Sequence, residues 1–333
     1  MATMYVTEPG ARIEKEYKRI LVTKHDEVLK VAPLARLSEV VLVGYVGATT
    51  PAMLALLDAG VGLTFITRSG RLRGRLMPPM PKNIPARQAQ YAAAQEPALC
   101  LHLARAIVSG KLRNSRTVAR RVVRERLGVD SGSIAEITRC LKALPAAADM
   151  DTIRGLEGRA ARVYFYVWRQ AFSGELVFER RTRRPPKDPI NSLLSLGYSL
   201  LTQNLMTACE VVGLDPYDGF FHADKHGRPA LALDLVEEFR AIIVDSLLRT
   251  LVNKRMVKAS DFRPAGGNKQ GVYLNRRGLR MFFSQYSRRL NTRVIHPHYG
   301  RRLTYQQCFE VQARLLRKVI EGELDDYPPF RVR

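Results

Sequence analysis

Cysteine is scarce in this sequence. Four cysteines occur among the 333 residues, far apart at Cys100, Cys140, Cys209 and Cys308. None of them shows the close Cys/Cys or Cys/His spacing of a structural zinc site, which argues against zinc. Buried thiols in a reducing compartment are the simpler interpretation, and they predict a cytoplasmic protein.

Long apolar runs are also missing. The longest uncharged stretch, residues 40–57, contains two glycines, two threonines and Pro51, which favours a strand, a turn and a helix start. The first 19 residues hold no apolar segment of the signal-peptide type. The sequence therefore predicts no membrane-spanning helix and no membrane partner.

Acidic residues are few relative to basic ones. The chain has 31 Asp and Glu against 54 Lys and Arg, a formal net charge of +23. This surplus favours a polyanionic partner, and nucleic acid comes first because arginine forks match phosphate oxygens. An arginine-rich proteome would explain arginine in place of lysine, but not the surplus. Arginines cluster within residues 120–126, 180–184, 276–280 and 288–289.

The first part of the chain has the pattern of a small sheet domain. A short helix is expected from Thr50, as N-cap before Pro51, to about Ala59. Ser69-Gly70 predicts a hairpin turn, and a Lys-His-Asp turn joins two earlier strands. The expected strands are Arg19–Thr23, Glu27–Val31, Val40–Val43, Gly62–Thr67 and Arg71–Met77.

A proline-rich segment then marks a change in composition. Prolines at 78, 79, 81 and 85 predict a stiff linker, and helical periodicity dominates after Arg87. Glycine, proline and charge at Ala259–Gln270 predict a loop. The expected helices are Pro85–Val108, Ser115–Leu127, Ser133–Leu144, Asp151–Ala171, Asp188–Val212, Leu231–Val252 and Tyr305–Glu321.

These patterns predict the fold class α+β. A small β-rich N-terminal domain, residues 1–82, is joined by the proline-rich linker to a larger all-α C-terminal domain, residues 83–333.

The first candidate for chemistry is Glu157, which lies between Gly155 and Gly158 in an otherwise apolar-periodic helix. Each glycine costs about 1 kcal/mol of helix stability against alanine, and it lets a backbone or ligand approach closely. The alternative is a surface glutamate that pairs with Arg154 one turn earlier.

The second candidate is His222, which follows the apolar Gly219–Phe221 and precedes a polar loop. An imidazole in this place can bind a divalent ion or act in proton transfer. The alternative is a hydrogen-bonded structural histidine. His226, within the loop, is expected to face solvent.

The third candidate is an acidic helix. Asp234, Glu237 and Glu238 stand at helical spacing and are expected to form one acidic patch without opposite charges inside it. Oxygen ligands with one histidine suit Mg²⁺ or Mn²⁺. The alternative is that these acids complement the helix dipole. With Glu157 and His222, they indicate a possible divalent-metal site beside a phosphate-binding surface.

Several long segments resemble one known family. They are GLEGRAARVYF from Gly155, RRPPKDPINSLLSLGYSLL from Arg183 and GLDPYDGFFHADKHGRPALALDLVEEFR from Gly213. They resemble CRISPR-associated protein one, the endonuclease and integrase of spacer acquisition in antiviral defence. TEPGARIEKE from Thr7 and QARLLRKVIEGELDDYPPF from Gln312 are similar to its type I, subtype C branch.

The resemblance implies a fold, partners and an activity. It implies a β-rich N-terminal domain, a helical C-terminal domain and homodimers, two of which flank a dimer of CRISPR-associated protein two. It implies a metal-dependent hydrolase or nuclease that uses Mg²⁺ or Mn²⁺ and joins the 3′-hydroxyl of a protospacer to CRISPR repeat DNA. CRISPR-associated protein four, a nuclease, is a further candidate partner.

The resemblance also implies a site. The metal-binding glutamate and histidine of the family fall on Glu157 and His222, and its acidic ligand falls on the helix of Glu237. Spacing favours Glu237 with Asp234 in support, but many relatives have Asp at this position and a shorter loop after the histidine. The choice between the two acids therefore stays open, and Glu238 is the weakest candidate. DNA contacts are expected from Arg180, Arg181, Arg183, Arg184 and Lys187.

The expected reaction is one-step transesterification, in which the incoming 3′-hydroxyl attacks and no protein nucleophile is needed. Two other functions fit the same residues. A non-catalytic nucleic-acid-binding protein would use Glu157, His222 and Glu237 only for structure. A repair nuclease acting on branched DNA would have the same site and another substrate.

Overall fold

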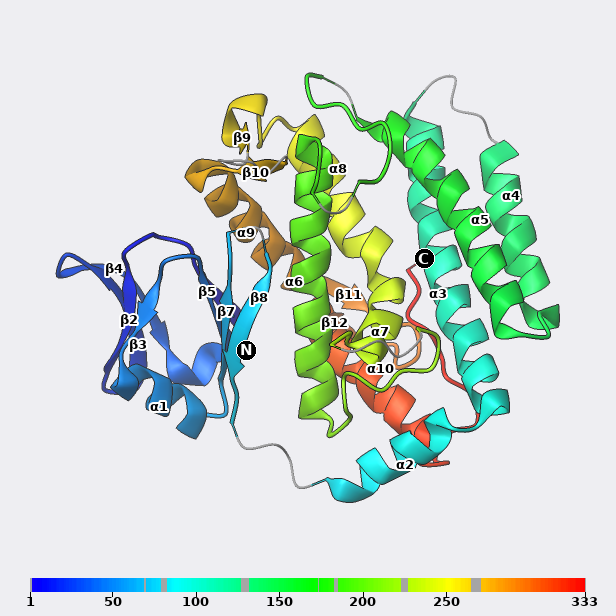
Figure 1. The fold of residues 1–333 in the computed structure, drawn as a ribbon, viewed down its shortest axis with the longest axis horizontal. Coiled ribbons are helices and arrows are strands. Elements are labelled where there is room, and N and C mark those ends of the chain that lie inside the picture. Colours follow the sequence, from blue (N-terminus) through cyan, green and yellow to red (C-terminus); the bar gives the residue numbers. More distant parts are fainter. Residues whose placement is uncertain are drawn as a thin grey trace. The chain divides into compact units, whose positions relative to one another are not determined.

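Strands come first along the chain and helices follow (Figure 1). The computed structural model describes residues 2–68, 70–78, 83–126, 132–172, 174–182, 185–222, 227–264 and 271–332. Its strand-rich segment covers residues 3–76, and the chain beyond it is mainly helical. This arrangement confirms the α+β class that the sequence predicts.

The chain folds into two compact units, each built from three segments. The first unit consists of Met1–Met80, Arg183–Ser199 and Val257–Arg288, and the second of Pro81–Thr182, Leu200–Met256 and Arg289–Arg333. The division into domains of residues 1–82 and 83–333 stays a prediction.

Two sheets form the strand-rich part of the first unit. In one, β1 (Ala2–Val6), β5 (Leu37–Val43) and β7 (Gly62–Ile66) are parallel, and β8 (Leu72–Leu76) pairs antiparallel with β7. The other has the order β4 (Glu27–Pro33), β3 (Arg19–Lys24), β2 (Arg12–Glu16) and β6 (Gly47–Ala48). The strands expected from the sequence are therefore confirmed.

Apolar side chains of both sheets share one core with helix α1 (Thr50–Asp58). Ile13 of β2, Leu56 of α1 and Leu63 of β7 are fully buried in it. The N-cap of α1 is Thr49, whose hydroxyl accepts a hydrogen bond from Ala52 N, so the expected cap at Thr50 was wrong by one residue. Ser69, the first residue of the expected hairpin turn, lies outside the described residues.

Two corrections concern the first helices of the second unit. The expected helix Pro85–Val108 breaks at Gln95–Glu96, giving α2 (Ile84–Ala94) and α3 (Pro97–Glu125). The break occurs because Pro97 has no backbone N–H and its ring opposes continuation of the helix. The expected gap after Val108 does not exist, since α3 runs unbroken through Gly110.

Helices α3, α4 (Gly132–Ala143) and α5 (Met150–Trp168) pack side by side (Figure 1). Leu112, Cys140 and Ile153 belong to their common apolar core, and Phe221 from a later loop packs into it. This packing places the loop residue next in sequence, His222, beside α3 and α5.

The rest of the chain is mostly helical, with short strand pairs. The expected helix Leu231–Val252 contains a π-helical turn at Ala241–Asp245. The expected loop at Ala259 contains a strand that pairs with a later one, and a helix not expected from the sequence follows. The elements are α6 (Pro189–Val211), α7 (Ala230–Arg240), α8 (Ser246–Asn253), β9 (Phe262–Pro264), β10 (Val272–Leu274), α9 (Arg276–Leu290), β11 (Arg293–Ile295), β12 (Arg302–Thr304) and α10 (Tyr305–Ile320).

Candidate functional site

The three acids of α7 do not form one patch. Asp234, Glu237 and Glu238 are all buried, with 0%, 3% and 0% of their surface exposed. Helix α7 is buried on several sides, and successive residues on a helix are turned by about 100°. Each acid therefore meets different partners, and the expected single patch was wrong.

Asp234 holds the backbone and ring of His222. Its Oδ2 accepts hydrogen bonds from Phe220 N (2.7 Å) and Phe221 N (3.0 Å), and its Oδ1 accepts from His222 N (2.9 Å). The same Oδ1 lies 2.7 Å from Nδ1 of His222. An ionised carboxylate only accepts, so the proton sits on Nδ1 and the lone pair on Nε2. This arrangement is typical of histidines that bind a metal through the other nitrogen.

Lys111 joins two carboxylates. Its Nζ contacts Oε1 of Glu157 and lies 2.5 Å from Oε2 of Glu237. Its side chain is only 14% exposed. The alternative pairing of Glu157 with Arg154 is not formed, because Arg154 pairs with Asp151 at 2.9 Å. Carboxylates from α5 and α7 therefore converge on one ammonium from α3.

Glu237 is charged despite its burial. Burial alone would raise its pKa, but the positive charges of Arg240 and Lys111 lower the pKa to about 2. Arg240 Nη1 lies 2.5 Å from Oε1. The other oxygen, Oε2, is buried and lies 2.5 Å from Nζ of Lys111, so the ion pair between them is at hydrogen-bond distance. The expectation that no opposite charge neighbours the acids of α7 was wrong.

Sequence reasoning missed Lys111 and Arg240. Lys111 fell in the expected gap between two helices, so no partner on a neighbouring helix was sought for it. The signal that could have found it is its place one turn after the buried Ile107 and Val108, on the same side of a continuous α3. A lysine in such a place needs an acidic partner.

Glu238 belongs to a separate, buried network. Its carboxylate accepts hydrogen bonds from Tyr327 Oη (2.6 Å), Gln312 Nε2 (3.0 Å) and Phe330 N (2.5 Å). Burial raises the pKa of Glu238 to about 8, although these hydrogen bonds oppose the rise. This residue ties the C-terminal segment to α7, which gives it a structural role.

His222, Glu157 and Glu237 are the residues that could hold a divalent cation. His222 Nε2 lies 3.9 Å from Glu237 Oε1, and both Glu157 and Glu237 reach Lys111. Within the described ranges, no three His, Cys, Asp or Glu side chains are placed as a ready metal-binding group. Two carboxylates and one imidazole nitrogen are nevertheless the donors that Mg²⁺ or Mn²⁺ takes. Oε1 of Glu157 and Oε2 of Glu237, which both face Nζ of Lys111, are two such donor atoms.

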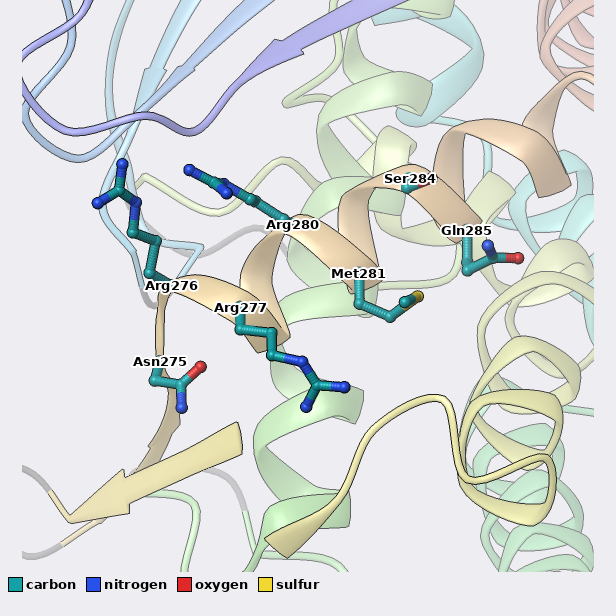
Figure 2. A pocket seen from close by; sticks show the side chains of 7 residues that line it. All are labelled: Asn275, Arg276, Arg277, Arg280, Met281, Ser284 and Gln285. Carbon is teal, nitrogen blue, oxygen red and sulfur yellow. The ribbon is translucent and has the colours of Figure 1, made fainter. Parts of the chain in front are cut away.

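The arginine-rich segments lie elsewhere in the chain. Arg180 and Lys187 are exposed and Arg181 is partly exposed, whereas Arg183 and Arg184 fall outside the described residues, as does His226. In the first unit, the start of α9 lines a pocket of about 740 Å³ (Figure 2). Arginines 276, 277 and 280 line it with Asn275, Met281, Ser284 and Gln285.

The comparisons with known proteins point to one family. The family model described as "CRISPR associated protein Cas1" matches residues 4–288. The chain is a member of the Cas1 family. It is 39% identical over 336 residues to "CRISPR-associated endonuclease Cas1 3" of Thermus thermophilus, covering 100% of this chain and 98% of that one. It is 36% identical to a Cas4/Cas1 fusion of Rhodospirillum rubrum, covering 98% of this chain and 57% of the fusion.

Solved structures share the fold of this Cas1. A casposase bound to integration product has a TM-score of 0.86 at 23% identity, covering 98% of this chain and 93% of that one. A Cas6-RT-Cas1–Cas2 complex has a TM-score of 0.82 at 24% identity, covering 99% of this chain and 36% of that one. No described helix combines the length and apolar character that a membrane crossing requires.

Proposed function

We propose that this Cas1 is a metal-dependent DNA endonuclease and integrase that joins protospacer 3′-ends to CRISPR repeat DNA. The observation that carries the proposal is that Glu157 and Glu237 both contact Lys111, while His222 Nε2 lies 3.9 Å from Oε1 of Glu237. The names of its relatives, endonuclease and casposase with integration product, support DNA phosphodiesters as the target. The net charge of +23 supports a polyanionic substrate.

In this proposal Glu157, His222 and Glu237 hold Mg²⁺ or Mn²⁺. Asp234 acts as the residue that orients His222, since both of its oxygens already accept hydrogen bonds. When bound, the ion supplies charge stabilisation at the scissile phosphate. Asp234 keeps the Nδ1 proton of His222 in place, which leaves Nε2 as the donor atom.

The reaction we propose is a single transesterification. The oxygen of the protospacer 3′-hydroxyl bonds to phosphorus of the repeat, and the bond from that phosphorus to the repeat's own 3′ oxygen breaks. The attacking hydroxyl loses one proton and the released 3′ oxygen takes one up. Lys111 and Arg240 place positive charge beside the reacting phosphate, so positioning and electrostatics supply the rate.

The proposed partners follow the same relatives. Cas2 is supported by the complex that contains Cas1 with Cas2, and Cas4 by the fused relatives. We also propose that the chain forms a homodimer. The motifs that begin at Thr7 and Gln312 support its assignment to the type I, subtype C branch. Free, mostly buried thiols fit action in the reducing cytoplasm.

The homodimer is proposed to form through β4. Val28 and Val31 of this edge strand are 51% and 46% exposed, and edge strands are prone to pair with another chain.

A strand-transfer assay tests the function. Purified chain and Glu157→Gln are incubated with a labelled half-integrated repeat DNA and Mn²⁺, with and without EDTA. We expect product only from the wild type with Mn²⁺, while both proteins bind DNA. Asp151→Asn, on the same helix but with a 91% exposed side chain, is the matched control and should react as wild type does.

Two outcomes would replace the proposal. Tight DNA binding without metal-dependent product, with or without Cas2, would indicate a non-catalytic binding protein. Equal reaction with unrelated branched DNA in competition would indicate a repair nuclease.

A further inference from the structure

The pairing of Lys111 is unusual among the ion pairs of the described chain. Its Nζ is shared by two carboxylates, Glu157 and Glu237, which come from different helices. These are the same oxygens that the proposed function gives to a divalent ion. A lysine ammonium and a divalent cation therefore compete for one position.

We propose that Lys111 is an exchangeable counter-ion. It neutralises Glu157 and Glu237 until a divalent ion displaces it, and it then pairs with a phosphate of the bound DNA. The inference rests on the proposed function. It adds that the metal ion and DNA bind cooperatively, because Lys111 exchanges one for the other, which the metal ligands alone would not cause.

The structure favours exchange over a fixed ion pair at Glu237. Oε1 of Glu237 is held by Nη1 of Arg240, whereas Oε2 faces Nζ of Lys111, which it shares with Glu157. A lysine carries a compact charge on a flexible four-carbon stem, so its ammonium can leave the carboxylates without any movement of α3. An arginine, whose planar guanidinium is rigid, would leave less easily.

Exchange has an energetic consequence. Displacing Lys111 leaves a poorly solvated ammonium, which opposes metal binding when no anion is near. A DNA phosphate gives that ammonium a new partner and removes the opposition. DNA should therefore tighten metal binding, and by reciprocity the metal should tighten DNA binding by the same factor.

The test is a calorimetric Mn²⁺ titration of the full chain, alone and with a duplex that lacks 3′-hydroxyl ends. We expect DNA to tighten Mn²⁺ binding to the wild type by roughly tenfold, within the usual range of coupling. Lys111→Met should bind Mn²⁺ about tenfold more tightly than wild type without DNA, and DNA should add little. Lys142→Met, which removes an exposed lysine on α4, controls for loss of charge alone.

Stability supplies a second readout. Without Mn²⁺, Lys111→Met leaves two buried or half-buried carboxylates without their shared cation, so its melting temperature should fall and should recover on adding Mn²⁺. If that variant fails to fold without metal, Lys111→Arg keeps the charge. It should retain the wild-type melting temperature but exchange less readily, with weaker Mn²⁺ binding.

The outcomes separate this inference from the proposed function. If Glu157→Gln abolishes Mn²⁺ binding but Lys111→Met binds Mn²⁺ as wild type does, Lys111 is only a structural ion pair and the inference is overturned. If wild type shows no Glu157-dependent Mn²⁺ binding at all, the proposed metal site fails and the inference falls with it.

Discussion

Asp234 and Glu237 lie one helical turn apart, yet they contact different groups. Asp234 accepts four hydrogen bonds, all from Phe220, Phe221 and His222. Glu237 contacts two side-chain cations, Lys111 and Arg240. The first acid shapes the loop that carries the histidine, and the second faces the site.

Replacing Asp234 should therefore act through His222. Asp234→Asn keeps one acceptor oxygen but offers donors to backbone N–H groups, so the ring of His222 loses its fixed orientation. We expect Mn²⁺ affinity to fall roughly 10- to 100-fold, as for other residues that orient metal-binding histidines. Titration followed by electron paramagnetic resonance measures this. An unchanged affinity would show that His222 needs no such support.

At the residue scale, local pattern indicated a metal site but left Glu157, His222 and Glu237 each with a structural alternative, and the family resemblance selected them. In the structure, Lys111 contacts Glu157 and Glu237. Phe221, in the core of α3, α4 and α5, anchors the neighbouring His222. Lys111 could not be assigned while its segment was read as a gap, because its partners are 46 residues away and further.

Among the elements, α5 carries Glu157 between Gly155 and Gly158. A Cβ on either glycine would meet no described atom within 4 Å. Gly110 of α3 differs, because its Cβ would lie 2.7 Å from Cβ of Pro329. Against the described part of the chain, the glycines of α5 therefore have no packing role, which leaves room for a ligand to approach Glu157.

This contrast predicts opposite effects of alanine. Gly155→Ala and Gly158→Ala should each raise the free energy of unfolding by up to about 1 kcal/mol, because helical glycine is unfavourable. Gly110→Ala should lower it by about 1–3 kcal/mol through overpacking. Urea denaturation followed by circular dichroism compares the three. Destabilisation by either α5 variant would reveal a packing role for that glycine.

The edge strand β4 leads to a second prediction at this scale. A bulge in its pairing with β3 places Val28 opposite Thr23 and Val31 opposite Leu21, so both valines lie on one face. Val28→Lys with Val31→Lys should abolish the proposed homodimer without unfolding the sheet, since both side chains are about half exposed. Sedimentation equilibrium measures the change, and a persisting dimer would place the interface elsewhere.

The boundaries of helices and strands could be predicted where turn or capping residues in the same segment determine them. The strands of the first unit and the start of α10 follow their turn and capping residues. Helix α9 was missed because its arginines were considered only as basic clusters, whereas Phe282 and Tyr286 are fully buried on this helix. The interruption at Pro97 is a local effect of proline that the predicted helix overlooked. The continuity of α3 at Gly110 depends instead on tertiary packing, which periodicity does not report.

The charge of the whole molecule predicts how it binds DNA. With a net charge of +23, affinity should fall steeply as salt rises, because phosphate contacts release counterions. Arg180→Ala or Lys187→Ala should each reduce the slope of log affinity against log salt by about 1. Arg139→Ala, an exposed residue paired with Glu136 on α4, is the control. Fluorescence anisotropy at several salt concentrations gives the slopes; an unchanged slope would remove that side chain from the DNA interface.

The C-terminal segment has a consequence for how the second unit folds. Val332 N donates to Asn114 Oδ1 across 218 residues, and Phe330 N donates to Glu238 across 92. Such distant pairings slow folding, because the chain must close long loops before the contacts form. During synthesis, Asn114 of α3 and Glu238 of α7 emerge before Phe330 and Val332, so these two hydrogen bonds form only once residues 330–332 have been made. The helices beside the site therefore complete their buried hydrogen bonding late.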